Sequence, residues 1–223
     1  VEIKRDGKVY RQRFESRYGK KTGKIIAGAS VTRLEEVGST NETGTMVRFL
    51  PDDRVFDEIK FNIETIAKRL RELAFLNRGI QIILNDLRQD KDLNTKSRRV
   101  FLFSGGLMDF VEYINEDKNV IHPEIIFLEG EKDGITAQIA IQYTDSYTES
   151  IFSYVNNIPT SEGGTHETGF KSAITKVLND YARKFNYLKE KDGNLNGEDF
   201  REGMTALISV KMRDIQFEGQ TKT

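Results

Sequence analysis

The sequence predicts an α+β fold in two parts, each with a sheet and an amphipathic helix. Short segments with alternating apolar and polar residues predict strands in both halves of the chain. Apolar residues at helical spacing predict one long helix in each half, within residues 59–73 and 170–185. Residues 86–99 are charged and lack an apolar period. We therefore expect one part at residues 1–99 and a second at residues 100–223.

Composition restricts the class of protein. Hydrophobic residues make up 37% of the 223 positions and charged residues 31%, as in a soluble globular protein. The net charge of -1 gives no overall basic field for binding nucleic acid. The chain has no cysteine, which excludes disulfides, thiol catalysis and thiolate metal sites. There is no signal peptide and no apolar run long enough to span a bilayer, so we expect no membrane partner and a cytoplasmic location.

The first part is predicted to begin with a hairpin over residues 1–14, with its turn at Asp6-Gly7. Residues 17–26 are basic and contain two glycines, so we expect a solvated loop there. A strand over residues 44–50 ends at Pro51. A helix with one apolar stripe and a strand at residues 80–84 follow, and residues 86–99 form a hairpin loop or an interdomain connection. The stripe consists of Ile59, Ile63, Ile66, Leu70 and Leu73.

The second part is predicted to follow the order β-β-β-α-β, after a short helix that begins at Leu107. Residues 135–143 alternate apolar and polar side chains, which is typical of a half-buried antiparallel strand. We expect the strand at residues 151–155 to pair with it across a turn near Asp145. Further strands are expected at residues 125–128 and 204–212.

The long helix of the second part follows a strand and a glycine-rich loop. Gly163 and Gly164 allow positive φ or a close backbone approach, and Thr165 or Thr168 is expected to cap the helix. The loop lacks a Gly-Lys-Ser/Thr continuation, so it is not a Walker A loop. From the residues alone it is either a phosphate cradle or a structural connection, and the local pattern favours the connection. The helix face expected to be buried carries Ile174, Val177, Leu178 and Tyr181.

Few side chains suggest catalysis. His122 and His166 are the two histidines, and each is better explained by a structural hydrogen bond than by catalysis. Two distant histidines without cysteine predict no zinc site. The carboxylates are scattered, and no spacing singles out an acid/base pair.

Four stretches, which follow one another along the chain in the family's order, carry a resemblance that spans nearly the whole chain. Residues 156–170 read Asn-Asn-Ile-Pro-x(3)-Gly-Gly-Thr-His-x(2)-Gly-Phe, residues 199–211 contain Arg-Glu-Gly, and residues 219–222 read Gly-Gln-Thr-Lys. Upstream, residues 43–52 contain Thr-Gly-Thr-Met-Val-Arg-Phe. Together they resemble the ATPase subunits of bacterial type II DNA topoisomerases, the gyrase B type or its topoisomerase IV counterpart.

The resemblance implies a fold and a division of the chain. Residues 1–99 are implied to be the C-terminal part of a GHKL (Bergerat) nucleotide-binding sandwich. Residues 100–223 are implied to be a transducer domain with a βαβ-type sheet and one long packed helix. The chain starts at Val1, without Met, within an expected strand, so we expect a fragment of a longer polypeptide.

The resemblance also implies site residues. Taken alone, Gln220 and Lys222 belong to an ordinary polar loop, and Thr45 is an ordinary strand residue. In the family, the matching Gln and Lys contact the γ-phosphate of ATP, so Lys222 is implied to be catalytic. The Thr matching Thr45 helps to hold the adenine-recognising carboxylate and a water. Arg5, from the short pattern Arg-x-Gly-Lys, matches a position at the rim of the pocket that is implicated in aminocoumarin inhibitor binding.

The implied ligands are ATP and Mg²⁺. The family's catalytic Glu, its Mg²⁺-binding Asn, its adenine-binding Asp and its ATP lid have no match here, so the metal ligands are expected outside this chain and the chain alone is expected to be inactive. The implied partners of the full-length protein are DNA, a gyrase A or topoisomerase IV A-type subunit, and a second copy in an ATP-dependent homodimer.

Two alternatives remain at this point. One is another GHKL ATPase of the MutL mismatch-repair type, and the paired Gly-Gly-Thr-His and Gln-Thr-Lys stretches argue against it. The other is a nonenzymatic nucleic-acid-binding βαβ module. The net charge of -1 and the lack of an aromatic RNA-binding motif disfavour that module.

Overall fold

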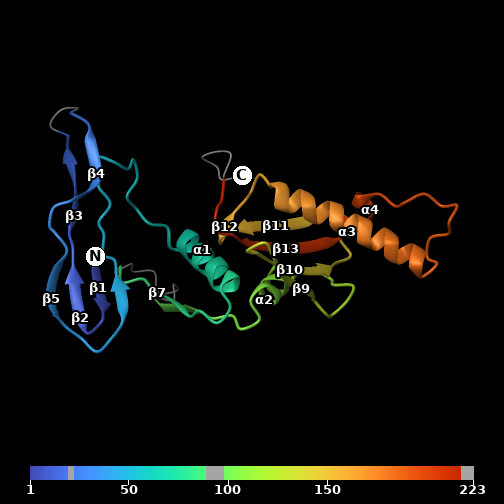
Figure 1. Cartoon of the computed structure of the whole chain (residues 1–223), viewed down its shortest axis with the longest axis horizontal. Helices are drawn as coiled ribbons and strands as arrows, with labels where there is room; N and C mark the ends of the chain where they lie inside the picture. Colours follow the sequence, from blue (N-terminus) through green and yellow to red (C-terminus); the bar gives the residue numbers. More distant parts are fainter. Residues whose placement is uncertain (20–22, 89–97, 217–223) are drawn as a thin grey trace. The chain divides into compact units, whose positions relative to one another are not determined.

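The computed structural model of the chain describes residues 1–19, 23–88 and 98–216 (Figure 1). It forms two compact units, Val1–Asn62 and Ile63–Thr223. Both contain sheets, and the helices belong to the second, so the fold is α+β as the sequence predicts.

The first unit contains a four-stranded sheet in the order β5-β2-β1-β6. Strands β1 and β2 form the predicted hairpin. Asp6 and Gly7 at its turn have φ values of 52° and 78°, as a tight two-residue turn requires. The strands of this sheet are β1 (Glu2–Arg5), β2 (Lys8–Arg11), β5 (Glu35–Ser39) and β6 (Gly44–Met46).

A second hairpin in the first unit corrects the expectation of a solvated loop at residues 17–26. Strands β3 (Phe14–Tyr18) and β4 (Ile25–Ser30) pair antiparallel and occupy both ends of that segment. Residues 20–22 lie outside the described part. The basic residues of this segment favoured the prediction of a loop, although apolar residues at both of its ends form strands. Strand β6 is also shorter than expected, ending at Met46 rather than at residue 50.

The first unit has no core of its own in the described residues: none of its described side chains is buried. Large apolar side chains are instead exposed, with Phe49 at 71% and Leu50 at 90%. Large apolar side chains exposed in this way are expected where another element packs.

The second unit is built on a five-stranded sheet in the order β12-β11-β13-β10-β9. The predicted pairing of β11 with β10 is wrong, because β13 lies between them, antiparallel to β10 and parallel to β11. A parallel neighbour requires a crossover, and the helix α3 supplies it. The strands are β9 (Ile126–Lys132), β10 (Ile135–Tyr143), β11 (Ser150–Val155), β12 (Ile158–Pro159) and β13 (Met204–Lys211).

Helices cover both faces of this sheet, and β13 is buried along seven of its eight residues. Ala140 and Leu207 face a cluster formed with α1 (Ile63–Leu76) and α2 (Leu107–Ile114). Their strand neighbours Ile141 and Ile208 face the opposite cluster, which includes Phe170 of α3 (Thr165–Lys184). Side chains along a strand alternate between faces, so α1 and α2 lie on one side and α3 on the other.

The helix α1 belongs to the second compact unit, which begins at Ile63. The Phe75 ring of α1 stacks on Phe103 and on Phe110 of α2, with centroids 3.6 and 4.6 Å apart. The hairpin of β7 (Ile82–Asn85) and β8 (Arg98–Phe101) packs on α1 as well. This aromatic stack joins α1 to the second unit. The expected domain boundary near residue 99 stays a prediction.

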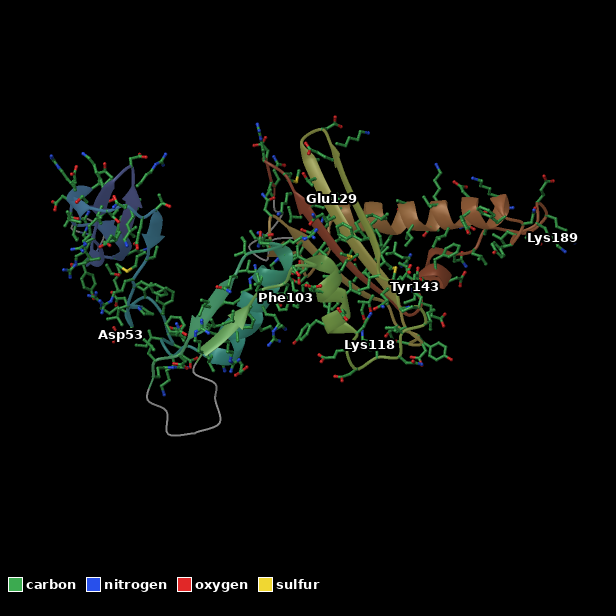
Figure 2. All side chains as sticks on the ribbon, turned by 90° about the horizontal axis from the view of Figure 1, so that it is seen from below. Asp53, Phe103, Lys118, Glu129, Tyr143 and Lys189 are labelled. Carbon is green, nitrogen blue, oxygen red and sulfur yellow. The ribbon has the colours of Figure 1, made fainter. Side chains whose placement is uncertain are left out.

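The apolar stripe of α3 is only partly buried, which corrects the expected helix face. Phe170 is buried and Ile174 is half-buried, but Val177 and Tyr181 are 61% and 52% exposed. The C-terminal half of α3 extends past the sheet, and Lys189 just beyond it lies far from the strands (Figure 2). Neither α3 nor any other helix among the described residues has the length and apolar character to cross a membrane.

Candidate functional site

Two of the predicted site residues, Arg5 and Thr45, lie on adjacent strands of the first unit. Thr45 of β6 is the register partner of Ile3 on β1. Arg5 is two residues further along β1, so the two side chains project from the same face of the sheet as diagonal neighbours. Thr45 is exposed, and the Arg5 Nε lies 3.4 Å from the Asp6 carboxylate. Both side chains are therefore available to a ligand on this face.

The other two predicted site residues, Gln220 and Lys222, lie outside the described residues. The structure does describe the strand that precedes them. The side chain of Asn156 accepts a hydrogen bond from the Met212 N–H at 3.0 Å and donates one to the Met212 carbonyl at 2.8 Å. The Asn156 N–H also donates to the Val210 carbonyl at 2.8 Å. Asn156 thus fixes the end of β13.

The neighbouring residue Asn157 connects the same place to α1. Its side chain donates to the Asn77 side chain at 3.0 Å, and its carbonyl accepts from the Arg69 guanidinium at 2.6 Å. Both Asn156 and Asn157 have positive φ, a conformation that asparagine tolerates better than most residues. The Asn-Asn pair therefore ties the end of β13 to α1, a role that the sequence did not reveal.

The glycine-rich loop requires its glycines. Gly163 has φ of 81°, and a Cβ on Gly164, where φ is 155°, would lie 2.8 Å from the His166 ring. The predicted threonine cap is wrong, because Gly164 occupies the N-cap position and α3 begins at Thr165. Glu167 in the first turn places a negative charge at the N-terminus of the helix, where the helix dipole favours it.

A buried set of polar side chains joins this loop to β11. The Ser153 and Thr160 hydroxyl oxygens lie 2.7 Å apart, and the Ser153 hydroxyl donates to the Glu167 carboxylate at 3.1 Å. His166 Nε2 lies 3.0 Å from the Thr160 oxygen. Burial lowers the pKa of His166, and the Glu167 charge opposes that change. Every contact within this set fixes the loop, which supports the structural explanation of His166.

Ion pairs extend the same set to the Arg-Glu-Gly stretch. Lys171 of α3 contacts Glu167 and Glu149 at 3.0 and 3.1 Å. Glu149 also accepts from Arg201 of α4 (Gly197–Arg201) at 2.6 Å. The burial of Glu149 is offset by these two cations, so its pKa lies below its ordinary value. Lys171 and Glu149 thus link two of the motifs that carry the resemblance.

The glycine of the Arg-Glu-Gly stretch turns the chain into β13. Gly203 has φ of 70°, and a Cβ there would lie 2.3 Å from the Thr144 carbonyl oxygen and 2.7 Å from that of Ser146. No side chain fits without displacing the backbone.

Gly203→Ala is therefore expected to lower the free energy of unfolding by about 2 kcal/mol or more, through backbone strain and overlap. Gly169→Ala is the control, because Gly169 lies within α3 with nothing within 4 Å of the added Cβ. That replacement is expected to stabilise the helix by up to about 1 kcal/mol. Urea unfolding of both variants measures the difference, and equal midpoints would contradict it.

His122 is structural as well. Its Nε2 accepts the Tyr143 N–H at 2.9 Å, and its Nδ1 lies 2.6 Å from the Glu124 carbonyl, so Nδ1 carries the proton. Among the residues that the structure covers, no group of three or more His, Cys, Asp or Glu side chains could hold a metal ion.

Comparison with known proteins identifies the family. The DNA gyrase B family model matches residues 106–223. The DNA gyrase B protein of Halalkalibacterium halodurans is 48% identical over 224 residues, which cover 100% of this chain and 33% of that protein. The DNA gyrase B protein of Clostridium acetobutylicum is 47% identical, with 100% and 32% covered. The chain thus spans about a third of these relatives.

Solved structures agree. The 43K ATPase domain of Thermus thermophilus gyrase B, in complex with an aminocoumarin, superposes with a TM-score of 0.75 at 33% identity, covering 98% of this chain and 56% of that one. The topoisomerase IV ATP-binding domain of Francisella tularensis has a TM-score of 0.73 at 28% identity, with 99% and 56% covered. The fold is that of part of the ATPase region of type II topoisomerases. More narrowly, the chain belongs to the DNA gyrase B family.

Proposed function

We propose that this chain is part of the ATPase region of a DNA gyrase, in which ATP binding and hydrolysis drive closure of a dimer gate and passage of one DNA duplex through another. The observation that carries the proposal is the fixed end of β13. Asn156 holds Met212, which lies eight positions before Gln220, and Asn157 holds Arg69 of α1. A strand end held at two places is suited to aim a short loop at a bound phosphate.

The proposed nucleotide contacts are divided along the chain. Lys222 is a compact cation with three donors, suited to the charge on the transferred phosphoryl group. Gln220 can donate its amide N–H to a phosphate oxygen. Thr45 and Arg5 project from one face of the first sheet and would form part of the pocket wall and its rim. Mg²⁺ would supply charge neutralisation when bound, and its ligands are expected outside this chain.

The first unit supports the same proposal. Its sheet exposes large apolar side chains, as expected if other elements of a GHKL sandwich cover it. We propose that the nucleotide-binding part extends to residue 99 and that the transducer follows, with α1 and the β7–β8 hairpin packed against the transducer. A contact to the γ-phosphate alone distinguishes ATP from ADP and can bias the arrangement of the two parts.

The proposed partners belong to the longer protein. They are DNA, a gyrase A-type subunit, and a second copy of the longer protein in an ATP-dependent dimer, and the proposed location is the cytoplasm.

The 223-residue chain alone is expected not to hydrolyse ATP, because the metal ligand and the base that support phosphoryl transfer are not matched in it. Phosphate release with ATP and Mg²⁺ measures this. Turnover that persists through repurification would contradict the assignment of these groups to another part of the protein.

A chimera tests the proposal itself. This chain replaces the matching 224 residues of the Halalkalibacterium halodurans gyrase B protein. We expect the chimera to hydrolyse ATP and, with its A-type subunit, to supercoil DNA. The control is the same chimera with residues 219–222 replaced by Gly-Ser-Gly-Ser. A folded chimera without ATPase activity would refute the proposal.

A further inference from the structure

A cavity of about 930 Å³ lies in the second unit, bounded by α1, α2, strand β11 and the loop at residues 159–163. Its volume is within the range of small-molecule sites, roughly 300–1,000 Å³. None of its lining residues belongs to the proposed nucleotide contacts.

Aromatic side chains form much of the wall. Phe110 and Tyr113 come from α2, and Phe152 comes from β11. Tyr113 and Phe152 are 44% and 39% exposed, so their rings are accessible to a ligand. This combination suits a flat apolar group.

Tyr154 contributes a hydroxyl to the wall. The residue as a whole is 4% exposed, its hydroxyl makes no hydrogen bond within the described part of the chain, and the hydroxyl oxygen itself is not fully enclosed. Burial, and then the charge of Glu72, raise the pKa of Tyr154 far above its ordinary value. The phenol therefore stays protonated and can donate a hydrogen bond to a ligand in the cavity.

Four carboxylates and two cations line the cavity. Three of its carboxylates are already paired: Glu64 with Arg99, Glu72 with Arg69, and Glu167 with Lys171.

Among the described residues, Lys68 and Arg71 of α1 have no carboxylate within ion-pair distance, and Glu162 is the one lining carboxylate without a cation. The Arg71 guanidinium lies 4.9 Å from the Tyr113 ring centroid and donates to the Tyr113 hydroxyl, which holds it at the wall.

We propose that this cavity binds a small aromatic anion, such as an aryl carboxylate, with its ring against Tyr113 and Phe152 and its anionic oxygens toward the Tyr154 hydroxyl and the Lys68 and Arg71 cations. This site goes beyond the proposed ATPase function. It joins α1 to β11 and to the loop before α3, so its ligand would hold these elements together.

Naphthalene-2-carboxylate is the probe, and the neutral naphthalene-2-carboxamide is its matched control. NMR titration of the ¹⁵N-labelled 223-residue chain is expected to shift the amide signals of Tyr113, Phe152 and Tyr154. The expected dissociation constant is on the order of 1 mM, as for a ligand of this size with ordinary ligand efficiency. The amide is expected to bind roughly tenfold more weakly, since it carries no charge. Equal binding of the two compounds would overturn the proposal.

Two pairs of variants locate the anion. Tyr154→Phe is expected to weaken carboxylate binding roughly tenfold, while Tyr187→Phe, at a tyrosine 76% exposed outside the cavity, leaves it unchanged. Lys68→Gln is expected to weaken it roughly threefold, while Lys176→Gln on the exposed part of α3 has no effect. Unchanged affinity in Tyr154→Phe would overturn the assignment of its hydroxyl.

Stability provides a test without any ligand. The Tyr143 hydroxyl donates to the Phe200 carbonyl at 2.7 Å, whereas that of Tyr154 has no partner in the described residues. Tyr143→Phe is therefore expected to lower the urea midpoint by roughly 0.5 M, and Tyr154→Phe is expected to leave it unchanged or raise it. An equal fall in both variants would show that the Tyr154 hydroxyl is satisfied within the protein and would refute the site.

Discussion

Phe75→Ala is expected to lower the free energy of unfolding of the second unit by about 3–5 kcal/mol, the range for removing a large buried aromatic side chain. Phe75 is 1% exposed, and its ring stacks between Phe103 and Phe110. Its removal leaves a cavity at the point where α1 joins α2 and the sheet. The loss combines apolar burial with two aromatic contacts, and the rigid sheet prevents the gap from closing.

Phe185→Ala is the matched control, since it removes the same side chain from the far end of α3. Phe185 is 51% exposed and contacts Tyr181 and Lys184 beyond the edge of the sheet. Its replacement is expected to cost under about 1 kcal/mol. Urea unfolding followed by circular dichroism compares the two. If Phe185→Ala were the more destabilising, the packing of both helices would be misassigned.

Much of the second unit could be predicted from local sequence patterns. Alternation at residues 135–143 predicted β10, and apolar spacing after Gly106 predicted α2. These patterns succeed because a side chain's face follows directly from the repeat of its strand or helix. The Asp6-Gly7 turn is likewise a local signal, since both residues need positive φ.

The pairing of strands could not be predicted in this way. Strand β13 enters the sheet between β10 and β11 after the whole of α3 and α4, a contact between residues far apart in the sequence. The prediction of the buried face of α3 was wrong for a related reason. Periodicity shows which side of a helix is apolar, but it does not show how far the opposing sheet extends. Val177 and Tyr181 are therefore exposed although they lie on the apolar side.

The candidate site likewise has features that the sequence predicts and features that only the structure shows. The loop's need for Gly163 and Gly164 follows from residue type, and the structure confirms it. The roles of Asn156, Arg201 and Gly203 depend on partners more than fifty residues away, at Met212, Glu149 and Thr144. The sequence shows that these residues belong to motifs. Their contacts become visible only in the folded structure.

Lys222→Ala in the gyrase chimera is expected to reduce ATP hydrolysis by roughly a hundredfold or more while sparing most nucleotide binding. Removing one preorganised donor to developing charge typically costs about 3 kcal/mol in the transition state. Adenine and the α- and β-phosphates would be held by residues outside this chain, so binding energy is largely retained. The structure describes the segment that precedes this loop, in which Asn156 makes two hydrogen bonds to Met212 at the end of β13.

Two further variants distinguish loss of the Lys222 cation from misplacement of the loop that carries it. Lys222→Arg keeps the charge but presents a planar fork in place of a compact ammonium, so it is expected to restore activity only in part. Asn156→Ala keeps Lys222 and releases the strand end, and it is expected to lower hydrolysis through misplacement, by roughly tenfold. Single-turnover hydrolysis, with titration of a nonhydrolysable ATP analogue, distinguishes chemistry from binding. Wild-type turnover in Lys222→Ala would make this loop an ordinary polar surface, and an unaltered rate in Asn156→Ala would show that the fixed end of β13 does not position it.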